Sequence, residues 1–213
     1  MSRIFRLGIT GKIGSGKSTL SEIARRNGII VLEADVIAKE VMGSNPEVRK
    51  KIESVFGSES YQNGVLNRPY LASKIFTNDS LRIQLEEIVH PATLEVIEKA
   101  FRDGKPGDII ALESAILFQT GLEEIFDAVI LIDASDAEII SRQEVSGKFN
   151  REDVINRLKQ QGYRNEWKED ADFVIFNNST EEEFIKRAEA LIKVVKIVAK
   201  QDLPEKSLRA ILE

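Results

Sequence analysis

Cysteine is missing from this sequence of 213 residues. Its absence excludes a disulfide framework, a thiolate metal site and catalysis by a cysteine nucleophile. It also fits a protein that works in a reducing compartment. Any catalytic or metal-binding chemistry must therefore use other side chains.

Long apolar runs and an excess of basic charge are missing as well. No apolar stretch approaches the roughly 20 residues that a membrane-spanning helix needs, and the first residues lack the pattern of a secretory signal peptide. The formal net charge of -5 argues against a duplex nucleic-acid partner, which requires a surplus of lysine and arginine. We therefore expect a cytoplasmic protein that binds neither membranes nor nucleic acids.

The composition is that of one folded domain. Hydrophobic residues make up 42% of the chain and charged residues 31%, which is too apolar for intrinsic disorder. A chain of this length usually forms one buried core, and no linker rich in proline, glycine or serine divides it. We expect a single domain over residues 1–213.

Short apolar runs rich in β-branched residues alternate with longer helical patterns, which is typical of parallel strands joined by helices. The runs lie at residues 4–10, 29–32, 109–112, 129–132 and 173–176. Residues 36–102 show helical periodicity and turns without a comparable strand. We expect an α/β fold with a central parallel sheet of about five strands and a helical insert at 36–102. Within the insert, a new helix is expected to begin at Pro91.

The strongest motif is a glycine-rich loop after the first predicted strand. A glycine, four residues, a second glycine, a lysine and then serine or threonine is the spacing of phosphate-binding loops. Glycines let successive backbone N–H groups turn toward a polyphosphate, and the following helix adds positive potential at its N-terminus. We expect ATP to bind at Gly11, Lys12, Ile13, Gly14, Ser15, Gly16, Lys17, Ser18 and Thr19.

Two residues of this loop have more specific predicted roles. Lys17 reaches the β- and γ-phosphates, and the Ser18 hydroxyl ligates Mg²⁺, which neutralises charge during transfer. The Asn-Lys-x-Asp and Asp-x-x-Gly elements of guanine-nucleotide switches are absent from the sequence. The loop and the alternation of strands and helices predict a three-layer α/β/α P-loop NTPase fold. The missing guanine-nucleotide elements favour ATP, used with Mg²⁺ to phosphorylate a small molecule.

Asp35 follows the second predicted strand, at the sheet edge where ligands bind in open α/β folds. A carboxylate there can take the proton of an attacking hydroxyl, hold that hydroxyl in line or ligate the metal. We expect Asp35 to act as base and to position the acceptor, with metal ligation as an alternative. The purely structural alternative is that Asp35 only N-caps a helix beginning near Val36.

Several segments occur in a specific order along the chain. They are the phosphate loop, residues 33–38, residues 65–71 and His90-Pro91, followed by Leu117-Phe118, Arg142, Gln161 and Asn177. In this order they resemble the dephospho-CoA kinase family over nearly the whole chain. The resemblance implies transfer of the ATP γ-phosphate to the ribose 3′-hydroxyl of dephospho-CoA. The products are CoA and ADP, in the last step of CoA biosynthesis.

The resemblance also implies which side chains meet the acceptor. The insert at 36–102 receives dephospho-CoA through Arg68 and His90, together with Asp35 and Leu117. A guanidinium suits this task because it can pair with a phosphate. The alternatives are that Arg68 is a solvated loop residue and that His90 is a packing residue at a helix start.

On the ATP side, the resemblance implies roles for Arg142 and Asn177 in nucleotide binding. Arg142 joins Lys17 in catalysis, because an arginine stays charged and donates to two phosphate oxygens at once. Residues 141–157 resemble a short lid that closes over ATP and excludes water. Lys148 is expected to replace an arginine that the family commonly has in this lid.

The sequence departs from the family's usual pattern in three further places. Glu113 stands where an aspartate is usual, and we expect it to support Mg²⁺ or its water shell. Gln119 stands where a glutamate is usual, so any anionic role is lost there. Lys12 replaces the more usual glycine of the loop, and we expect its side chain to face outward.

Two other functions stay open at this point. A nucleoside or nucleotide kinase would share the loop and lid but would have a different acceptor pocket, which the segments around Arg68 and His90 argue against. A CoA- or nucleotide-binding regulator without turnover is favoured by Gln119 and the altered lid. Measurable turnover with dephospho-CoA would exclude the regulator.

Overall fold

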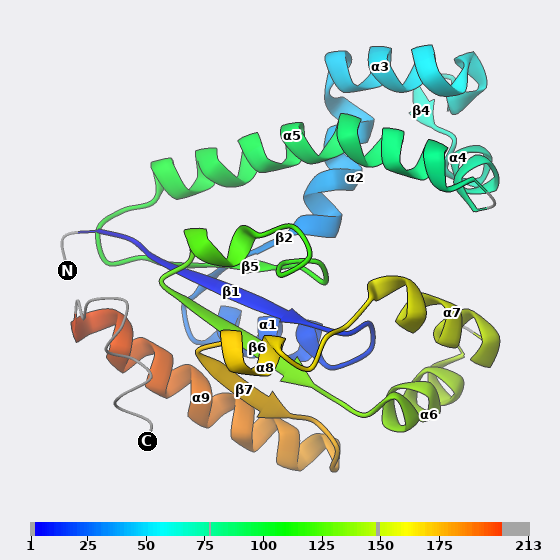
Figure 1. The fold of residues 1–213 in the computed structure, drawn as a ribbon. Helices are drawn as coiled ribbons and strands as arrows, with labels where there is room; N and C mark the ends of the chain where they lie inside the picture. Colours follow the sequence, from blue (N-terminus) through cyan, green and yellow to red (C-terminus); the bar gives the residue numbers. More distant parts are fainter. Residues whose placement is uncertain (1–2, 77, 148–149, 202–213) are drawn as a thin grey trace. The chain divides into compact units, whose positions relative to one another are not determined.

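The computed structural model describes residues 3–76, 78–147 and 150–201. The chain divides into two compact units. The sheet unit consists of Met1–Leu32 with Gly104–Glu213, and the helical unit is Glu33–Asp103. Figure 1 shows the main sheet with its flanking helices in the first unit and mostly helices in the second.

The sheet unit is built on five strands with β1 in the middle (Figure 1). They are β2 (Ile30–Glu33), β5 (Ile109–Glu113), β1 (Phe5–Gly11), β6 (Ala128–Asp133) and β7 (Phe173–Phe176), in this spatial order. β1 runs parallel to both β5 and β6, and β7 runs parallel to β6. Leu7 on β1 lies opposite Ala111 on one side and Ala128 on the other. The predicted α/β fold and each of its five strands are confirmed.

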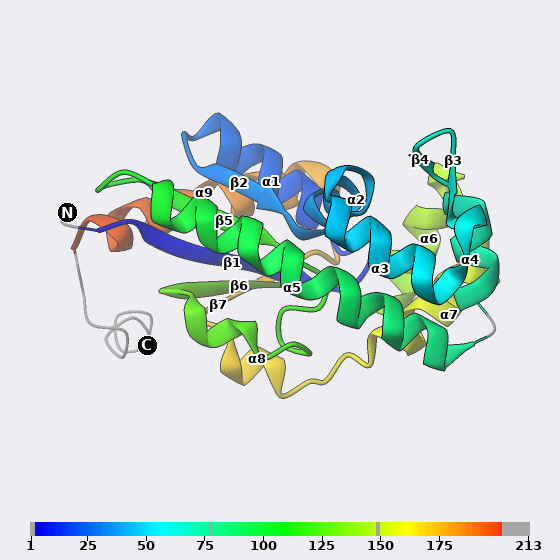
Figure 2. The same ribbon diagram turned by 90° about the horizontal axis from the view of Figure 1, so that it is seen from above.

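Helices make up the rest of the regular structure of the sheet unit. They are α1 (Lys17–Arg26), α6 (Asp136–Ser146), α7 (Arg151–Gln161), α8 (Trp167–Asp170), α9 (Glu181–Gln201) and the short 3₁₀ helix η2 (Leu122–Ile125). Figures 1 and 2 together show α1 and α9 on one face and α8 on the other. Because successive strand residues point to opposite faces, Leu7 and Ile9 are fully buried under α1 and α9, with Phe184 of α9.

Helices α6 and α7 form a hairpin that follows β6. Ala134, Ile139 and Val154 are fully buried together and give this hairpin a small core of its own. Ser135 caps α6 by accepting a hydrogen bond from the Glu138 N–H. Such caps stabilise a helix by about 1 kcal/mol. Within the described residues, no helix has the length and apolar character needed to cross a membrane.

The helical unit consists mainly of four α-helices. In chain order its elements are α2 (Ala34–Ser44), α3 (Pro46–Phe56), η1 (Ser58–Ser60), β3 (Tyr61–Gln62), β4 (Val65–Leu66), α4 (Arg68–Ile75) and α5 (Asp79–Asp103). The long helix α5 packs against α2, α3 and α4. The two-residue strands β3 and β4 form an antiparallel hairpin before α4.

The prediction that a helix begins at Pro91 is wrong. Helix α5 runs from Asp79 to Asp103 with Pro91 inside it. An internal proline removes one backbone hydrogen bond and costs about 3 kcal/mol. Val89, Ile97 and Phe101 lie buried on one side of the same helix, and burying side chains of this size contributes about 1.5–3 kcal/mol each. Packing therefore keeps the helix continuous where local sequence favours a break.

Replacing Ile130 by alanine tests how far the fold depends on the middle of the sheet. Ile130 on β6 is fully buried, so we expect Ile130→Ala to lower the free energy of unfolding by about 2–5 kcal/mol. Urea unfolding followed by circular dichroism measures this loss. The control is Ile197→Ala on α9, because Ile197 is 57% exposed and its truncation should change stability by about 0.5 kcal/mol or less. Equal losses in the two variants would contradict this account of the core.

Candidate functional site

The phosphate-loop sequence lies where the central strand passes into the first helix. β1 ends at Gly11 and α1 begins at Lys17. The loop therefore lies at the carboxyl end of β1, and the first backbone N–H groups of α1 point toward it. These groups have no partners within their own helix and carry partial positive charge, which favours an anion.

Lys17 is held at the loop by the loop's own backbone. Its Nζ donates to the Gly11 carbonyl at 2.9 Å and to the Lys12 carbonyl at 3.0 Å. A phosphate in the loop would thus lie beside a positioned ammonium group. The contact with phosphate itself stays a prediction.

Asn177 supports the loop from behind. It follows β7, is only 6% exposed, and its Nδ2 donates to the Ser15 carbonyl at 2.8 Å. Next to it, Gly16 has a φ of 112°, and a Cβ there would lie 2.6 Å from the Asn177 amide nitrogen and 3.1 Å from the Phe184 ring. Asn177, predicted to bind ATP, thus contacts the loop backbone and leaves room only for glycine at position 16.

Ser18 and Glu113 place two oxygen atoms that can ligate a metal ion close to each other. Glu113 ends β5, and its carboxylate accepts from the Ser21 hydroxyl at 2.6 Å and more weakly from the Ser18 hydroxyl at 3.4 Å. Among the described residues, no group of three or more acidic or histidine side chains could hold a metal. A hydroxyl and a carboxylate nevertheless fit Mg²⁺, which usually binds through one or two protein oxygens, with phosphates and water completing its shell.

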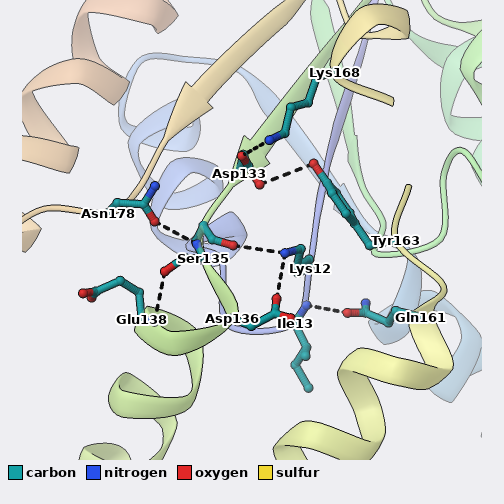
Figure 3. A network of polar contacts seen from close by, with 11 residues as sticks. Lys12, Ile13, Asp133, Ser135, Asp136, Glu138, Gln161, Tyr163, Lys168 and Asn178 are labelled. Carbon is teal, nitrogen blue, oxygen red and sulfur yellow. Dashed lines mark hydrogen bonds and ion pairs between the residues drawn. The ribbon is translucent and has the colours of Figure 1, made fainter. Parts of the chain in front are cut away.

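Lys12 does not face outward, contrary to expectation. Its side chain is 13% exposed, and Nζ forms an ion pair with Asp136 at 2.7 Å. Nζ also donates to the Ala134 carbonyl at 3.3 Å and lies 4.5 Å from the centre of the Tyr163 ring. Figure 3 shows this ammonium group directed toward the start of α6. A carboxylate, a carbonyl and an aromatic face together offset the cost of taking the charge out of water.

Arg142 and Leu117 differ in their access to a ligand. Arg142 on α6 donates to the Ser179 carbonyl at 3.2 Å and pairs with Glu138 at 3.5 Å. Leu117 is fully buried, and a Cβ on Gly8 of β1 would lie 2.9 Å from its Cδ1. Leu117 therefore packs in the core, and its contact with an acceptor stays a prediction. Lys148, the expected substitute for a lid arginine, lies outside the described residues.

Asp35, Arg68 and His90 all belong to the helical unit. Helix α2 begins at Ala34, and Glu33 occupies its N-cap position, so the alternative that Asp35 is the N-cap is wrong. Asp35 lies in the first turn of α2 with its side chain exposed. Arg68 is the exposed first residue of α4, and His90 lies half-buried within α5. His90 therefore does not start a helix.

Gln161, Tyr163 and Asp133 are contacts of this site that the sequence did not assign. Gln161 Oε1 accepts from the Ile13 N–H of the loop at 2.8 Å. Asp133 is buried, accepts from the Tyr163 hydroxyl at 3.3 Å and pairs with Lys168 at 2.6 Å (Figure 3). Burial, and then the nearby Asp133 carboxylate, raise the pKa of the Tyr163 phenol, so it stays a donor. Gln161 matched the family pattern, but nothing local in the sequence indicated its partner.

The sequence comparisons agree with one another. A family model described as dephospho-CoA kinase matches residues 5–183. A dephospho-CoA kinase from Bacillus cereus is 35% identical over 179 residues, which covers 82% of this chain and 88% of the relative.

Comparison with solved structures agrees with the sequence comparisons. A Thermus thermophilus protein superposes with a TM-score of 0.74 at 28% identity, covering 91% of this chain and 98% of that chain. A dephospho-CoA kinase from Campylobacter jejuni gives a TM-score of 0.68 at 26% identity, covering 94% and 100% respectively.

Adding a methyl group at Gly16 tests the close packing behind the loop. We expect Gly16→Ala to abolish binding of ADP, because the new Cβ collides with Asn177 and forces the loop out of shape. Isothermal titration calorimetry with ADP and Mg²⁺ measures this effect. The matched control is Gly107→Ala. Gly107 also has a positive φ, 96°, but no described heavy atom lies within 4 Å of its Cβ position. If both variants bind ADP equally, the packing of Asn177 does not shape the loop.

Proposed function

The chain belongs to the dephospho-CoA kinase family, and from this premise we propose how its residues carry out the reaction. The reaction transfers the γ-phosphoryl group of ATP to dephospho-CoA. The oxygen of the ribose 3′-hydroxyl forms a bond to the γ-phosphorus, the bond from that phosphorus to the β-γ bridging oxygen breaks, and the hydroxyl proton leaves. The products are CoA and ADP. The observation that carries the ATP side is the phosphate loop between β1 and α1 with Lys17 held across it.

ATP is proposed to bind with its phosphates against the loop, residues Gly11–Thr19. Lys17 exchanges its bonds to the Gly11 and Lys12 carbonyls for phosphate oxygens, which follows the usual role of this lysine. Arg142 adds a second cation from α6. The Ser179 carbonyl and Glu138 orient its guanidinium, so little rotamer freedom is lost when phosphate binds. Asn177 keeps the loop backbone in shape.

Ser18 and Glu113 are proposed to hold Mg²⁺. When bound, the ion neutralises negative charge on the phosphate oxygens. The Ser18 hydroxyl offers a direct ligand, and the Glu113 carboxylate already accepts a hydrogen bond from Ser21, which fixes its orientation. Glu113 therefore serves the role that an aspartate usually has in the family.

The helical unit is proposed to receive the acceptor. Asp35 acts as the base, because it is exposed in the first turn of α2 and is not used as a helix cap. Arg68, exposed at the start of α4, pairs with a phosphate of dephospho-CoA, and His90 contributes from α5. Residues 141–157 of the α6–α7 hairpin act as the lid. The cytoplasmic location stays a prediction.

Turnover is tested by measuring ADP release with ATP, Mg²⁺ and dephospho-CoA, in parallel with adenosine, AMP and pantothenate as acceptors. We expect product with dephospho-CoA alone, and mass spectrometry should identify it as CoA. Lys17→Ala is the negative control, because it removes the ammonium group from the loop. Activity on another acceptor without CoA formation would contradict the proposed acceptor. Binding of both substrates without any product would favour a regulator.

Replacing Asp35 by asparagine tests the proposed base. We expect Asp35→Asn to lower kcat by about 10²–10⁴-fold and to leave the KM for ATP nearly unchanged, because proton removal belongs to the transition state. Steady-state kinetics with varied ATP measure both parameters. The matched control is Asp79→Asn, since Asp79 is another exposed aspartate in a helix's first turn. A parallel loss of kcat and ATP affinity would exclude the role of base.

A further inference from the structure

Both ends of the α6–α7 hairpin are bonded to neighbouring residues of the phosphate loop. Asp136, the first residue of α6, forms an ion pair with Lys12 at 2.7 Å. Gln161, the last residue of α7, accepts a hydrogen bond from the Ile13 N–H at 2.8 Å. Figure 3 shows the two contacts side by side. The hairpin is therefore attached to the loop where it leaves the sheet unit and where it returns.

The Lys12 side chain is more buried than is usual for lysine, and its amino group has several protein partners. The side chain is 13% exposed, although lysine usually keeps its charge in water. Its Nζ meets Asp136, the Ala134 carbonyl and the face of the Tyr163 ring. Tyr163 in turn donates to the buried Asp133, which also pairs with Lys168. The ammonium group is thus directed to protein partners at the base of the hairpin.

The contact through Gln161 is supported by a second glutamine. The Gln161 carbonyl accepts from Gln119 Nε2 at 2.9 Å, while the Gln161 side chain accepts from the loop. A glutamate at position 119 would carry an acceptor-only carboxylate at neutral pH and could not donate this bond. Lys12 and Gln119, which both depart from the usual family pattern, therefore meet the same segment around Gln161 and Tyr163.

Two further observations support the view that this cluster joins segments of the protein. A Cβ on Gly14 of the loop would lie 2.8 Å from Gln143 Nε2 and 3.2 Å from Ile139 Cγ2, so α6 also packs directly on the loop. The cavity among Lys12, Gln119, Gln161 and their neighbours has a volume of only about 10 Å³, roughly the space of one water molecule.

We propose that Lys12 and Gln161 are positioning residues that couple phosphate binding in the loop to the orientation of the α6–α7 hairpin. The inference rests on the proposed function only in that the loop binds a nucleotide. Phosphates that fix the backbone of Lys12 and Ile13 also fix the two residues at the ends of the hairpin. Such coupling is reciprocal. The factor by which bound phosphate favours this hairpin orientation is also the factor by which this orientation raises the affinity for phosphate. Because Arg142 lies on α6, the same coupling would influence where its guanidinium lies relative to the bound phosphates.

The protein contains a natural reporter of this coupling. Trp167 is its single tryptophan. The indole lies edge-on to the Tyr163 ring, with 5.4 Å between the ring centres, and stacks on Phe118 at 5.6 Å. A displacement at Tyr163, which faces Lys12, should alter the emission of Trp167.

The first experiment titrates ADP with Mg²⁺ into the full chain and records Trp167 fluorescence, with calorimetry as an independent measure of affinity. We expect a fluorescence change in the wild type that is largely lost in Lys12→Met and Asp136→Asn, while ADP affinity falls by less than about threefold, well under one tenfold step of 1.4 kcal/mol. The double variant should match either single variant, because both substitutions remove the same ion pair. Gln161→Leu removes the contact at the other end of the hairpin and should also reduce the fluorescence change.

A matched control comes from an ion pair on α9. Lys186 and Glu182 are 2.8 Å apart, four residues from each other on one helix, and largely exposed. Lys186→Met removes the same type of side chain from an ion pair of similar N–O distance, but at an exposed site. It should leave both the fluorescence change and the ADP affinity at wild-type values.

Three results would overturn the coupling. One is a wild type whose Trp167 emission does not respond to ADP that calorimetry shows to be bound. Another is a Lys12→Met variant that shows the full fluorescence change on ADP binding and differs from the wild type only in a lower unfolding temperature. The ion pair would then be purely structural. The third is a large loss of ADP affinity in Lys12→Met that Asp136→Asn does not share, which would mean that Lys12 binds phosphate directly.

Steady-state kinetics then separate positioning from binding. Because these bonds join protein segments, Lys12→Met should lower kcat by about tenfold, equivalent to 1.36 kcal/mol of activation free energy, with a small change in the KM for ATP. An unchanged kcat would contradict the proposal. The ADP titration requires no acceptor, so failure of the coupling is distinguishable from failure of dephospho-CoA as substrate.

Discussion

The turn between β1 and α1 is the constraint on which the rest of the sheet unit depends. A loop that presents its N–H groups to phosphate must have its carbonyls paired and its backbone held in place by other segments. Asn177 after β7 provides one support by binding the Ser15 carbonyl, and Phe184 of α9 closes the space beside Gly16. β1 itself is held between two parallel neighbours. The loop is therefore supported by Asn177, by α9 and by the strands on either side of β1.

The charged groups at this edge are of two kinds, those proposed to bind the substrate and those that bind other parts of the protein. Lys17 bonds to the loop's own carbonyls, which are partners that a phosphate can replace. Lys12 bonds to a carboxylate and an aromatic face, and Lys168 to the buried Asp133. Lys17 and Arg142 are the cations proposed to meet ATP, and Arg142 also pairs with Glu138. The same type of side chain therefore has different roles because its partners differ.

The sequence predicted the strands well because parallel strands in such folds are short continuous apolar runs, and all five runs became strands. It failed at Pro91, where burial of Val89, Ile97 and Phe101 keeps α5 continuous. It also failed to exclude Asp35 as the N-cap of α2. The helix begins one residue earlier, at Ala34, and sequence patterns do not locate a helix end to within one residue. Leu117 shows a similar limit, since an apolar residue after a strand can line a pocket or fill the core.

By itself, the sequence determined the phosphate loop, the α/β fold and the dephospho-CoA kinase family, because each depends on local spacing or on the order of motifs. Only the tertiary structure decided what Lys12 and Gln161 contact. Lys12 and Asp136 are 124 residues apart in the chain, and Ile13 and Gln161 are 148 apart. No local pattern encodes such pairs. They form because parallel strands place the ends of distant segments at one edge of the sheet, where a buried charge or N–H group must find a partner.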